Sequence, residues 1–114
     1  MSTVFAVQKQ MKWDTDTDEY VPKFNLDVCK EYGKCVFLLS PTAGPFNSEG
    51  IITDIKKNLA AFTPDDFLLL VGNPCIIGWV VAIAASKLQP GQALKLLQWS
   101  GKDKRYLCIE SKLF

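Results

Sequence analysis

The stretch 67–87, FLLLVGNPCIIGWVVAIAASK, is the part of the chain that decides the fold. Its first residues, 67–71, form an unbroken apolar run, which is typical of a strand covered on both faces of a parallel sheet. Gly72 ends this run, Asn73 is a favoured helix N-cap, and Pro74 suits the first helical position. The stretch therefore predicts a buried strand, a tight turn and a helix.

The predicted helix is apolar on nearly every side, so we expect it to be largely buried. Gly78, Ala82 and Ala85 recur on one of its faces and predict a close approach to a neighbouring element. The apolar run 75–85 is shorter than the roughly 20 residues that a membrane-spanning helix needs. The sequence therefore favours a core helix.

The remaining elements are predicted from apolar periodicity and turn residues. Residues 3–13 alternate as a strand and return at 20–24 as a hairpin, in which Pro22 confines the second strand to an edge. The other predicted elements are a short helix at 25–32 capped by Asn25, a strand at 35–39, a helix from Asn47 or Ser48 to about Phe62, and a hairpin of 93–99 and 105–111.

Strands that begin near residues 35, 67 and 93 are each separated by a helix, which gives a β-α-β-α-β series. Helical crossovers of this size imply parallel pairing. The 114 residues are enough for a single hydrophobic core. We therefore predict one α/β domain over residues 1–114, with a mixed sheet, a parallel core, and N- and C-terminal hairpins.

The net charge of +1 argues against a general nucleic-acid coat and against a polybasic membrane binder. The charge is unevenly spread along the chain. Residues 93–114 carry five bases against two acids, whereas residues 14–19 carry four acids and no base. These two segments are the strongly charged regions of the predicted surface.

The composition also narrows the chemistry. The chain has no histidine, which removes the commonest general base and metal ligand. Its four cysteines match no zinc spacing and are expected to be reduced, mostly buried thiols, Cys75 among them. No signal peptide is evident at Met1–Thr3, so we expect a cytoplasmic protein, and we predict no metal and no cofactor.

The carboxyl ends of parallel strands meet at one edge of a sheet, where open α/β folds bind their ligands. We expect the loops 40–47, 72–75 and 101–105 at this edge. Two of them begin helices, whose N-termini attract anions, and the third is cationic. The candidate binding residues are Ser40, Thr42, Asn73, Lys102, Lys104 and Arg105, with no catalytic residue among them. The alternative is that all six are solvated turn residues.

Two segments carry a resemblance to a known family. FLLLVGNPCIIGWVVAIAA at 67–85 and LKLLQWSGKDKRY at 94–106 resemble parts of short proteins from tailed phages that infect marine cyanobacteria. The resemblance implies a cytoplasmic, non-enzymatic protein that is made during infection and acts on a host or phage macromolecule. It transfers no functional residue to this chain.

Three functions remain open. The leading hypothesis is a small binding or regulatory module with a protein partner and a possible homodimer. The second is nucleic-acid binding through Lys102, Lys104 and Arg105, with Lys95 as a further candidate and with Trp99 and Tyr106 beside the turn. The third is an enzyme that acts on a phosphorylated small molecule at the strand-end edge and uses an Asp, Cys or Lys side chain as its base. No membrane partner is expected.

Overall fold

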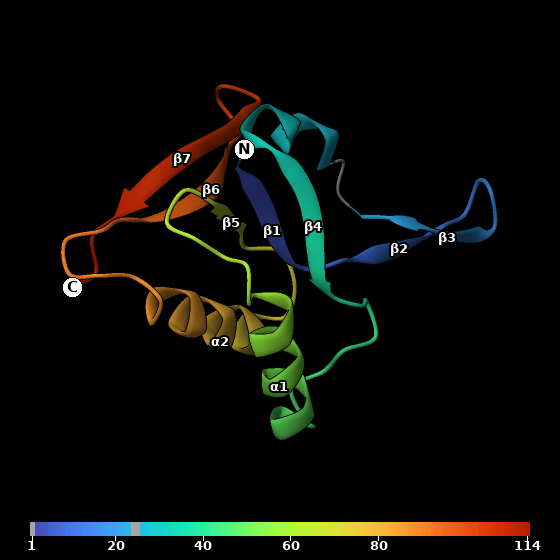
Figure 1. Ribbon diagram of the computed structural model, residues 1–114. Helices are drawn as coiled ribbons and strands as arrows, with labels where there is room; N and C mark the ends of the chain where they lie inside the picture. Colours follow the sequence, from blue (N-terminus) through green and yellow to red (C-terminus); the bar gives the residue numbers. More distant parts are fainter. Residues whose placement is uncertain (1, 24–25) are drawn as a thin grey trace.

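The computed structural model describes residues 2–23 and 26–114 and shows a twisted five-stranded sheet with two α-helices beneath it (Figure 1). The strand order is β4-β1-β5-β6-β7. β1, β4, β5 and β6 run parallel, and β7 pairs antiparallel with β6. Their bounds are β1 Thr3–Gln8, β4 Lys34–Leu39, β5 Phe67–Leu69, β6 Leu94–Ser100 and β7 Arg105–Ser111. The predicted α/β class, with parallel strands and a C-terminal hairpin, is confirmed.

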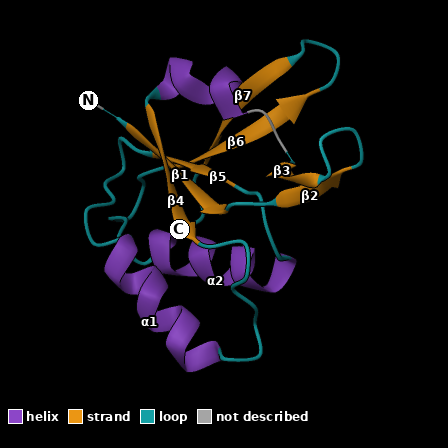
Figure 2. Cartoon of the chain, turned by 90° about the vertical axis from the view of Figure 1, so that its right-hand side faces the viewer, coloured by secondary structure: helices purple, strands orange, loops and turns teal. Residues whose placement is uncertain are grey.

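Both faces of the sheet are covered near its middle. Helices α1 (Ser48–Asn58) and α2 (Pro74–Ala85) lie on one face, and the 3-10 helix η1 (Leu26–Tyr32) lies on the other (Figure 2). Because side chains alternate along a strand, β1 sends Phe5 and Val7 into the core under the α-helices and Val4 and Ala6 into the core under η1. β1 is therefore buried on both faces.

The expected N-terminal strand at 3–13 is in fact two strands. β1 ends at Gln8 and pairs in parallel with β4 and β5, so its predicted place in a hairpin is wrong. The hairpin is made by β2 (Met11–Asp14) and β3 (Glu19–Pro22), which form a separate two-stranded sheet. The physical difference is burial: residues 4–8 are all buried, as a doubly covered strand requires, whereas residues 11–14 are half-exposed or exposed.

The helix boundaries follow the capping residues. α2 begins at Pro74, and the Asn73 side chain accepts the N–H groups of Cys75 at 2.9 Å and Ile76 at 3.3 Å, as predicted. Asn47 occupies the N-cap position of α1 but makes no side-chain cap bond. α1 ends at Asn58, earlier than expected, although Phe62 is still buried in the turn that follows.

The cap predicted at Asn25 and the strand end predicted at Phe24 lie outside the described residues. Residues 26–32 form a 3-10 helix, which ends before Gly33 at a φ of 145°. A Cβ on Gly33 would lie 2.2 Å from the carbonyl oxygen of Ser2, so only glycine fits this close approach.

The expectation of a largely buried α2 is only half right. Ile76, Val80 and Ala84 are fully buried, but Cys75, Gly78 and Ala82 are exposed. A Cβ placed on Gly78 would meet no atom within 4 Å, so no described residue approaches the stripe closely there, whereas Ala85 at its end is buried in the core. The reason is geometric: α2 lies on one face of the sheet, which leaves its opposite side to solvent (Figure 2).

Candidate functional site

The order of the strands creates a crevice at the carboxyl end of the sheet. The chain leaves β1 toward β4 on one side, and it leaves β5 toward β6 on the other side. The connections after the neighbouring strands β1 and β5 therefore diverge, which defines a topological switch point. Open α/β sheets bind their ligands at such points, so we looked for a cavity there.

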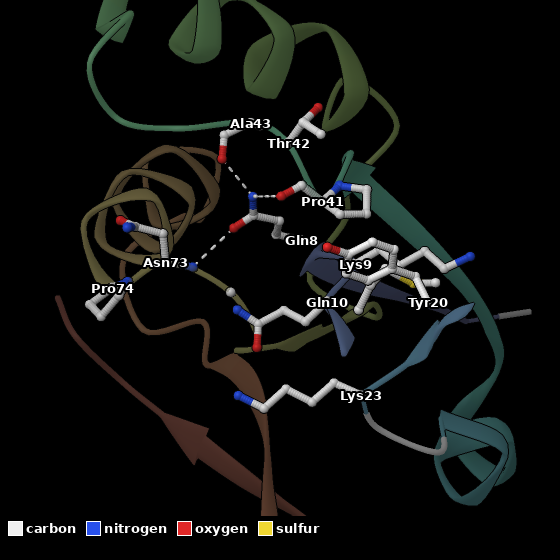
Figure 3. A pocket seen from close by; sticks show the side chains of 12 residues that line it. Gln8, Lys9, Gln10, Tyr20, Lys23, Pro41, Thr42, Ala43, Asn73 and Pro74 are labelled. Carbon is white, nitrogen blue, oxygen red and sulfur yellow. Dashed lines mark hydrogen bonds between the residues drawn. The ribbon is translucent and has the colours of Figure 1, made fainter. Parts of the chain in front are cut away.

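A pocket of about 800 Å³ opens at this switch point (Figure 3). Its walls are residues 8–11 from the end of β1 to the start of β2, residues 41–43 after β4 and residues 72–74 after β5, with Tyr20 of β3 and Lys23 just after it. The volume lies within the range of roughly 300–1,000 Å³ that is typical of ligand pockets. We call this cavity the switch-point pocket.

Gln8 holds the walls of the pocket together. The side chain is 4% exposed. Its Nε2 donates to the carbonyl oxygens of Ala43 at 2.6 Å and Ser40 at 3.1 Å, and its Oε1 accepts the backbone N–H of Asn73 at 3.0 Å. One amide at the end of β1 thus ties the loop after β4 to the turn after β5 (Figure 3). Both polar atoms of the amide are hydrogen bonded within the chain, so Gln8 has a structural role. We call this set of hydrogen bonds the Gln8 clasp.

Gly72 makes room for this clasp. Its φ of 130° lies in the region that side chains rarely adopt, and a Cβ there would lie 2.6 Å from the Cβ of Gln8. Glycine at this position therefore serves both the turn after β5 and the packing of Gln8.

The N-terminus of α2 lies beside the pocket, and its own cap uses several of its N–H groups. Asn73 Oδ1 occupies the N–H groups of Cys75 and Ile76, and the Asn73 carbonyl accepts the N–H of Ile77 at 2.9 Å. Pro74 has no N–H to give. The cap therefore occupies N–H groups that could otherwise meet an anion, and the expected attraction of an anion to this N-terminus stays a prediction.

The charge of the pocket comes from its lysines. Lys9 and Lys23 line it, and none of the described lining residues is acidic. The Lys9 ammonium lies 5.9 Å from the centre of the Phe37 ring, on the β4 side of the pocket. The pocket is thus lined by two cationic side chains and by the Gln8 amide, whose polar atoms are hydrogen bonded within the chain.

The β2–β3 hairpin, residues 11–22, projects away from the sheet and is called the arm below (Figure 1). One of its faces carries Met11, Trp13, Tyr20 and Pro22, and we call it the aromatic face. Trp13 and Tyr20 lie directly opposite each other with ring centroids 5.0 Å apart, yet they are 48% and 68% exposed. Tyr20 and Met11 also line the pocket, so the two features adjoin.

The structure brings only some of the six predicted site residues together. Thr42 and Asn73 line the pocket, and Ser40 lies beside them with its Oγ 3.1 Å from Thr42 Oγ1. Lys102, Lys104 and Arg105 do not line it. The turn that carries them is at the top of Figure 1, far from the 40–47 loop. Whether any of the six binds a ligand stays a prediction.

The separation of the two groups has a physical cause. β4 and β6 are three strand spacings apart in the sheet, and successive strands rotate by about 20–25°. The carboxyl ends of β4 and β6 therefore point in different directions, although both strands run parallel to β1 and β5. A single site built from all three loops does not form.

The turn at 101–104 is a compact basic hairpin end. Ser100 Oγ donates to Asp103 Oδ2 and accepts the Asp103 N–H, each at 3.1 Å. Trp99 is 43% exposed beside it and stacks edge-on against Tyr106 at 5.1 Å. The half-exposed indole thus precedes a turn whose three cations are all exposed.

Three of the four thiols, those of Cys29, Cys35 and Cys108, do not line the pocket and are poor nucleophiles. Burial, together with the neighbouring Cys29, raises the pKa of Cys35 to about 12. Burial also raises the pKa of Cys29 and of Cys108. Cys75 is exposed, which corrects the expectation that it is buried. Among the described residues no group of His, Cys, Asp or Glu could hold a metal ion.

Sequence reasoning missed the residues that shape the site. The partners of Gln8 are 32 to 65 positions away in the sequence, so no local pattern reveals its role. Trp13 and Tyr20 were assigned to strands, but alternation alone does not say which face is covered. The only available signal was the cluster of acids between them.

Fold and pocket together define a small α/β protein of the open, doubly wound type with its crevice at the switch point. In the described part of the chain, no helix combines the length and the apolar character that crossing a bilayer requires. A model of the Phage Pam3 gp32-like protein family matches residues 2–113, and the chain belongs to this family. It is thus a phage protein. Neither the curated proteins nor the solved structures contain a match.

Proposed function

We propose that this phage protein is a non-enzymatic binding module whose partner is another protein and whose contact surface is the aromatic face of the arm with the adjoining pocket. The action would take place in the cytoplasm of an infected cell, in marine cyanobacteria as the resemblance implies. The observation that carries the proposal is the exposed pair Trp13 and Tyr20 on an arm that stands clear of the core.

The energetics of the arm support this proposal. An isolated two-stranded hairpin is marginal in water. Large aromatic side chains dominate protein interfaces because they bury much area at a low entropic cost. An arm that places two of them in solvent is poorly suited to stabilising its own chain and well suited to contacting a partner.

The chemistry of the pocket points the same way. Its deepest polar group, the Gln8 amide, is fully bonded inside the chain. In the described residues no buried side-chain N or O atom lacks a partner. No buried polar group of the described residues is thus left unpaired for a small substrate, whereas the lining lysines and Tyr20 suit a protein segment with an apolar side chain and a carboxylate.

A site-specific photo-crosslink tests the proposal in infected cells. A photoreactive phenylalanine replaces Tyr20, and the control carries it at Phe114, since the two positions are 68% and 74% exposed. We expect a defined protein adduct from position 20 that the additional change Trp13→Ala removes, with the thermal midpoint unchanged. Equal adducts from both positions, or none from position 20, would contradict the proposal.

A second candidate function rests on the basic turn. Trp99 is half-exposed beside Lys102, Lys104 and Arg105, which is the arrangement that stacks and neutralises single-stranded nucleic acid. Binding of a labelled oligonucleotide would then weaken with salt with a log–log slope of about −2 for three phosphate contacts. Replacement of the three cations by alanine should abolish it, and the absence of binding at low salt ends this candidate.

A further inference from the structure

β4 is an edge strand of the sheet, and the hydrogen bonds around it show which of its backbone groups point outward. In a parallel ladder, successive residues turn their backbone groups to opposite sides of the strand. The Leu39 carbonyl accepts the Lys9 N–H at 3.3 Å, so Leu39 faces the β1 side. The Leu38 carbonyl faces away, and the Asn58 side chain of α1 donates to it at 2.7 Å. Val36 lies two residues before Leu38 and therefore also faces outward.

Val36 leaves a backbone donor and a backbone acceptor at this edge. Among the described residues, none hydrogen bonds to the outward N–H or C=O of Val36. Proteins commonly block such an edge with a charged residue, a proline or a bulge. Residues 35–39, CVFLL, contain no charge and no proline, and their register with β1 has no inserted residue. The edge of β4 is therefore open to pairing with another extended chain.

The opposite edge of the sheet, β7, is less open. Arg105 and Glu110 place charges within this strand. The Tyr106 carbonyl also accepts the Tyr32 hydroxyl at 2.7 Å, which ties β7 to η1. Of the two edges, β4 is thus the better template for an added strand.

The edge of β4 also adjoins the contact surface proposed above. The Phe37 side chain shares the η1 face of the sheet with its register partner Ala6 and is 37% exposed. The ammonium of Lys9, which lines the pocket, lies 5.9 Å from the centre of the Phe37 ring. β4 also leads directly toward residues 41–43, which form one wall of the pocket (Figure 3). A chain that follows the edge of β4 therefore ends beside the pocket.

We infer that the protein partner adds an extended segment to the outer edge of β4, as a further strand of the five-stranded sheet. This inference rests on the proposed function and names the form in which the partner is recognised. Outward groups that recur about every 7 Å along a strand match the spacing of another extended chain. A helix bonds its own backbone groups and has none to offer. A β-branched or aromatic side chain of the segment suits the contact with Phe37.

Amide exchange of the free protein, followed by NMR, tests whether the edge is open. We expect the Val36 N–H to exchange at least about tenfold faster than the Phe37 N–H, because Phe37 faces β1 and is bonded in the ladder. A Val36 amide as protected as that of Phe37 would show that the chain covers its own edge, and it would overturn the inference.

A photoreactive phenylalanine in place of Phe37 tests the added strand in infected cells. We expect an adduct with the same protein that position 20 captures. Val36→Pro removes the outward N–H and should lower the yield of both adducts at least about tenfold. The control Ser48→Pro puts a proline at the exposed first residue of α1, where no N–H is needed, and should leave both yields unchanged.

Circular dichroism confirms that both proline variants are folded. If Val36→Pro does not fold, an ester in place of the Val36 amide removes the same donor without the ring, and it should lower both yields.

The outcomes separate this inference from the proposed function. If position 20 gives its adduct but position 37 gives none, captures a different protein or captures a second copy of this chain, the inference is overturned and the proposed function stands. Yields that do not change in the folded Val36 variant would also overturn the inference. The absence of any adduct from position 20 would remove the proposed function and the inference together.

Discussion

The sheet and the arm are built from similar strands but differ in where their apolar side chains go. β1 has two neighbouring strands and a covered core on each face, and its residues 4–8 are all buried. β2 and β3 pair only with each other, and Trp13 and Tyr20 remain largely in solvent. The comparison teaches that the sheet stabilises the chain, while the arm presents aromatic surface for contact.

The buried polar residues likewise lie in or beside strands of the sheet and not in the arm. Gln8 at the carboxyl end of β1 and Asp66 just before β5 are both buried and hydrogen bonded to segments far away in the sequence. Asp66 accepts the backbone N–H groups of Thr3 and Thr63. These contacts fix the two ends of the parallel strands. No comparable polar contact to the sheet fixes the outer part of the arm among the described residues.

The largest expected effect comes from a matched pair of truncations. Leu68 is fully buried in β5, and Leu68→Ala should lower the free energy of unfolding by about 2–5 kcal/mol. Trp13→Ala removes a larger side chain but should cost less than about 1 kcal/mol, since the ring is half-exposed. Urea unfolding of the dilute protein measures both. Similar losses would mean that the arm is part of the core.

Two glycines give the next effect. Gly72→Ala introduces a Cβ at a φ of 130° and 2.6 Å from Gln8 Cβ. We expect it to destabilise the protein by about 1–3 kcal/mol. Gly101→Ala is the control, because a Cβ there meets nothing within 4 Å. Thermal unfolding compares the two, and an equally stable Gly72→Ala would show that the Gln8 clasp is not tight.

A smaller effect is expected from the two helix caps. Asn73→Ala removes the side-chain acceptor of two N–H groups and should cost about 1 kcal/mol. Asn47→Ala removes a side chain that makes no cap bond, so the unfolding midpoint should hardly move. If Asn47→Ala were the more costly change, the assignment of the functional cap to α2 would be refuted.

The last effect is a dependence on alkaline pH, which is absent at neutral pH. The pKa of Cys35 is raised to about 12 from an ordinary value of 9.0, so the folded chain keeps a proton that the unfolded chain loses. Stability is therefore constant below about pH 9 and declines as the pH rises toward 12. Burial raises the pKa of Tyr106 in the same direction. In Cys35→Ser the decline in urea midpoint should be shallower, and an unchanged slope would count against this cause.

Much of the sheet was predictable because its signals are local. The boundary at Gly72, Asn73 and Pro74 is set by residues adjacent in sequence, and the structure places turn, cap and first helical residue there. The helical spacing of Ile51, Ile55 and Leu59 likewise located their buried face. The antiparallel β6–β7 pair was predicted from the turn that connects it.

The rest depended on contacts that the sequence does not display. Residues 3–13 alternate well enough to resemble one strand, and only their partners in β4 and β5 show that β1 ends at Gln8. The apolar composition of α2 does not tell that Gly78 and Ala82 face solvent. The twist that separates the basic turn from the pocket accumulates over three strand pairs, which no local motif records.

Hydrogen–deuterium exchange of the dilute protein tests the central claim most directly, that the sheet stabilises the chain while the arm adds little to that stability. The account predicts that amides of β1 and β5 are protected and that amides of β2 and β3 exchange rapidly. Arm amides as protected as those of β1 in the dilute sample would contradict it.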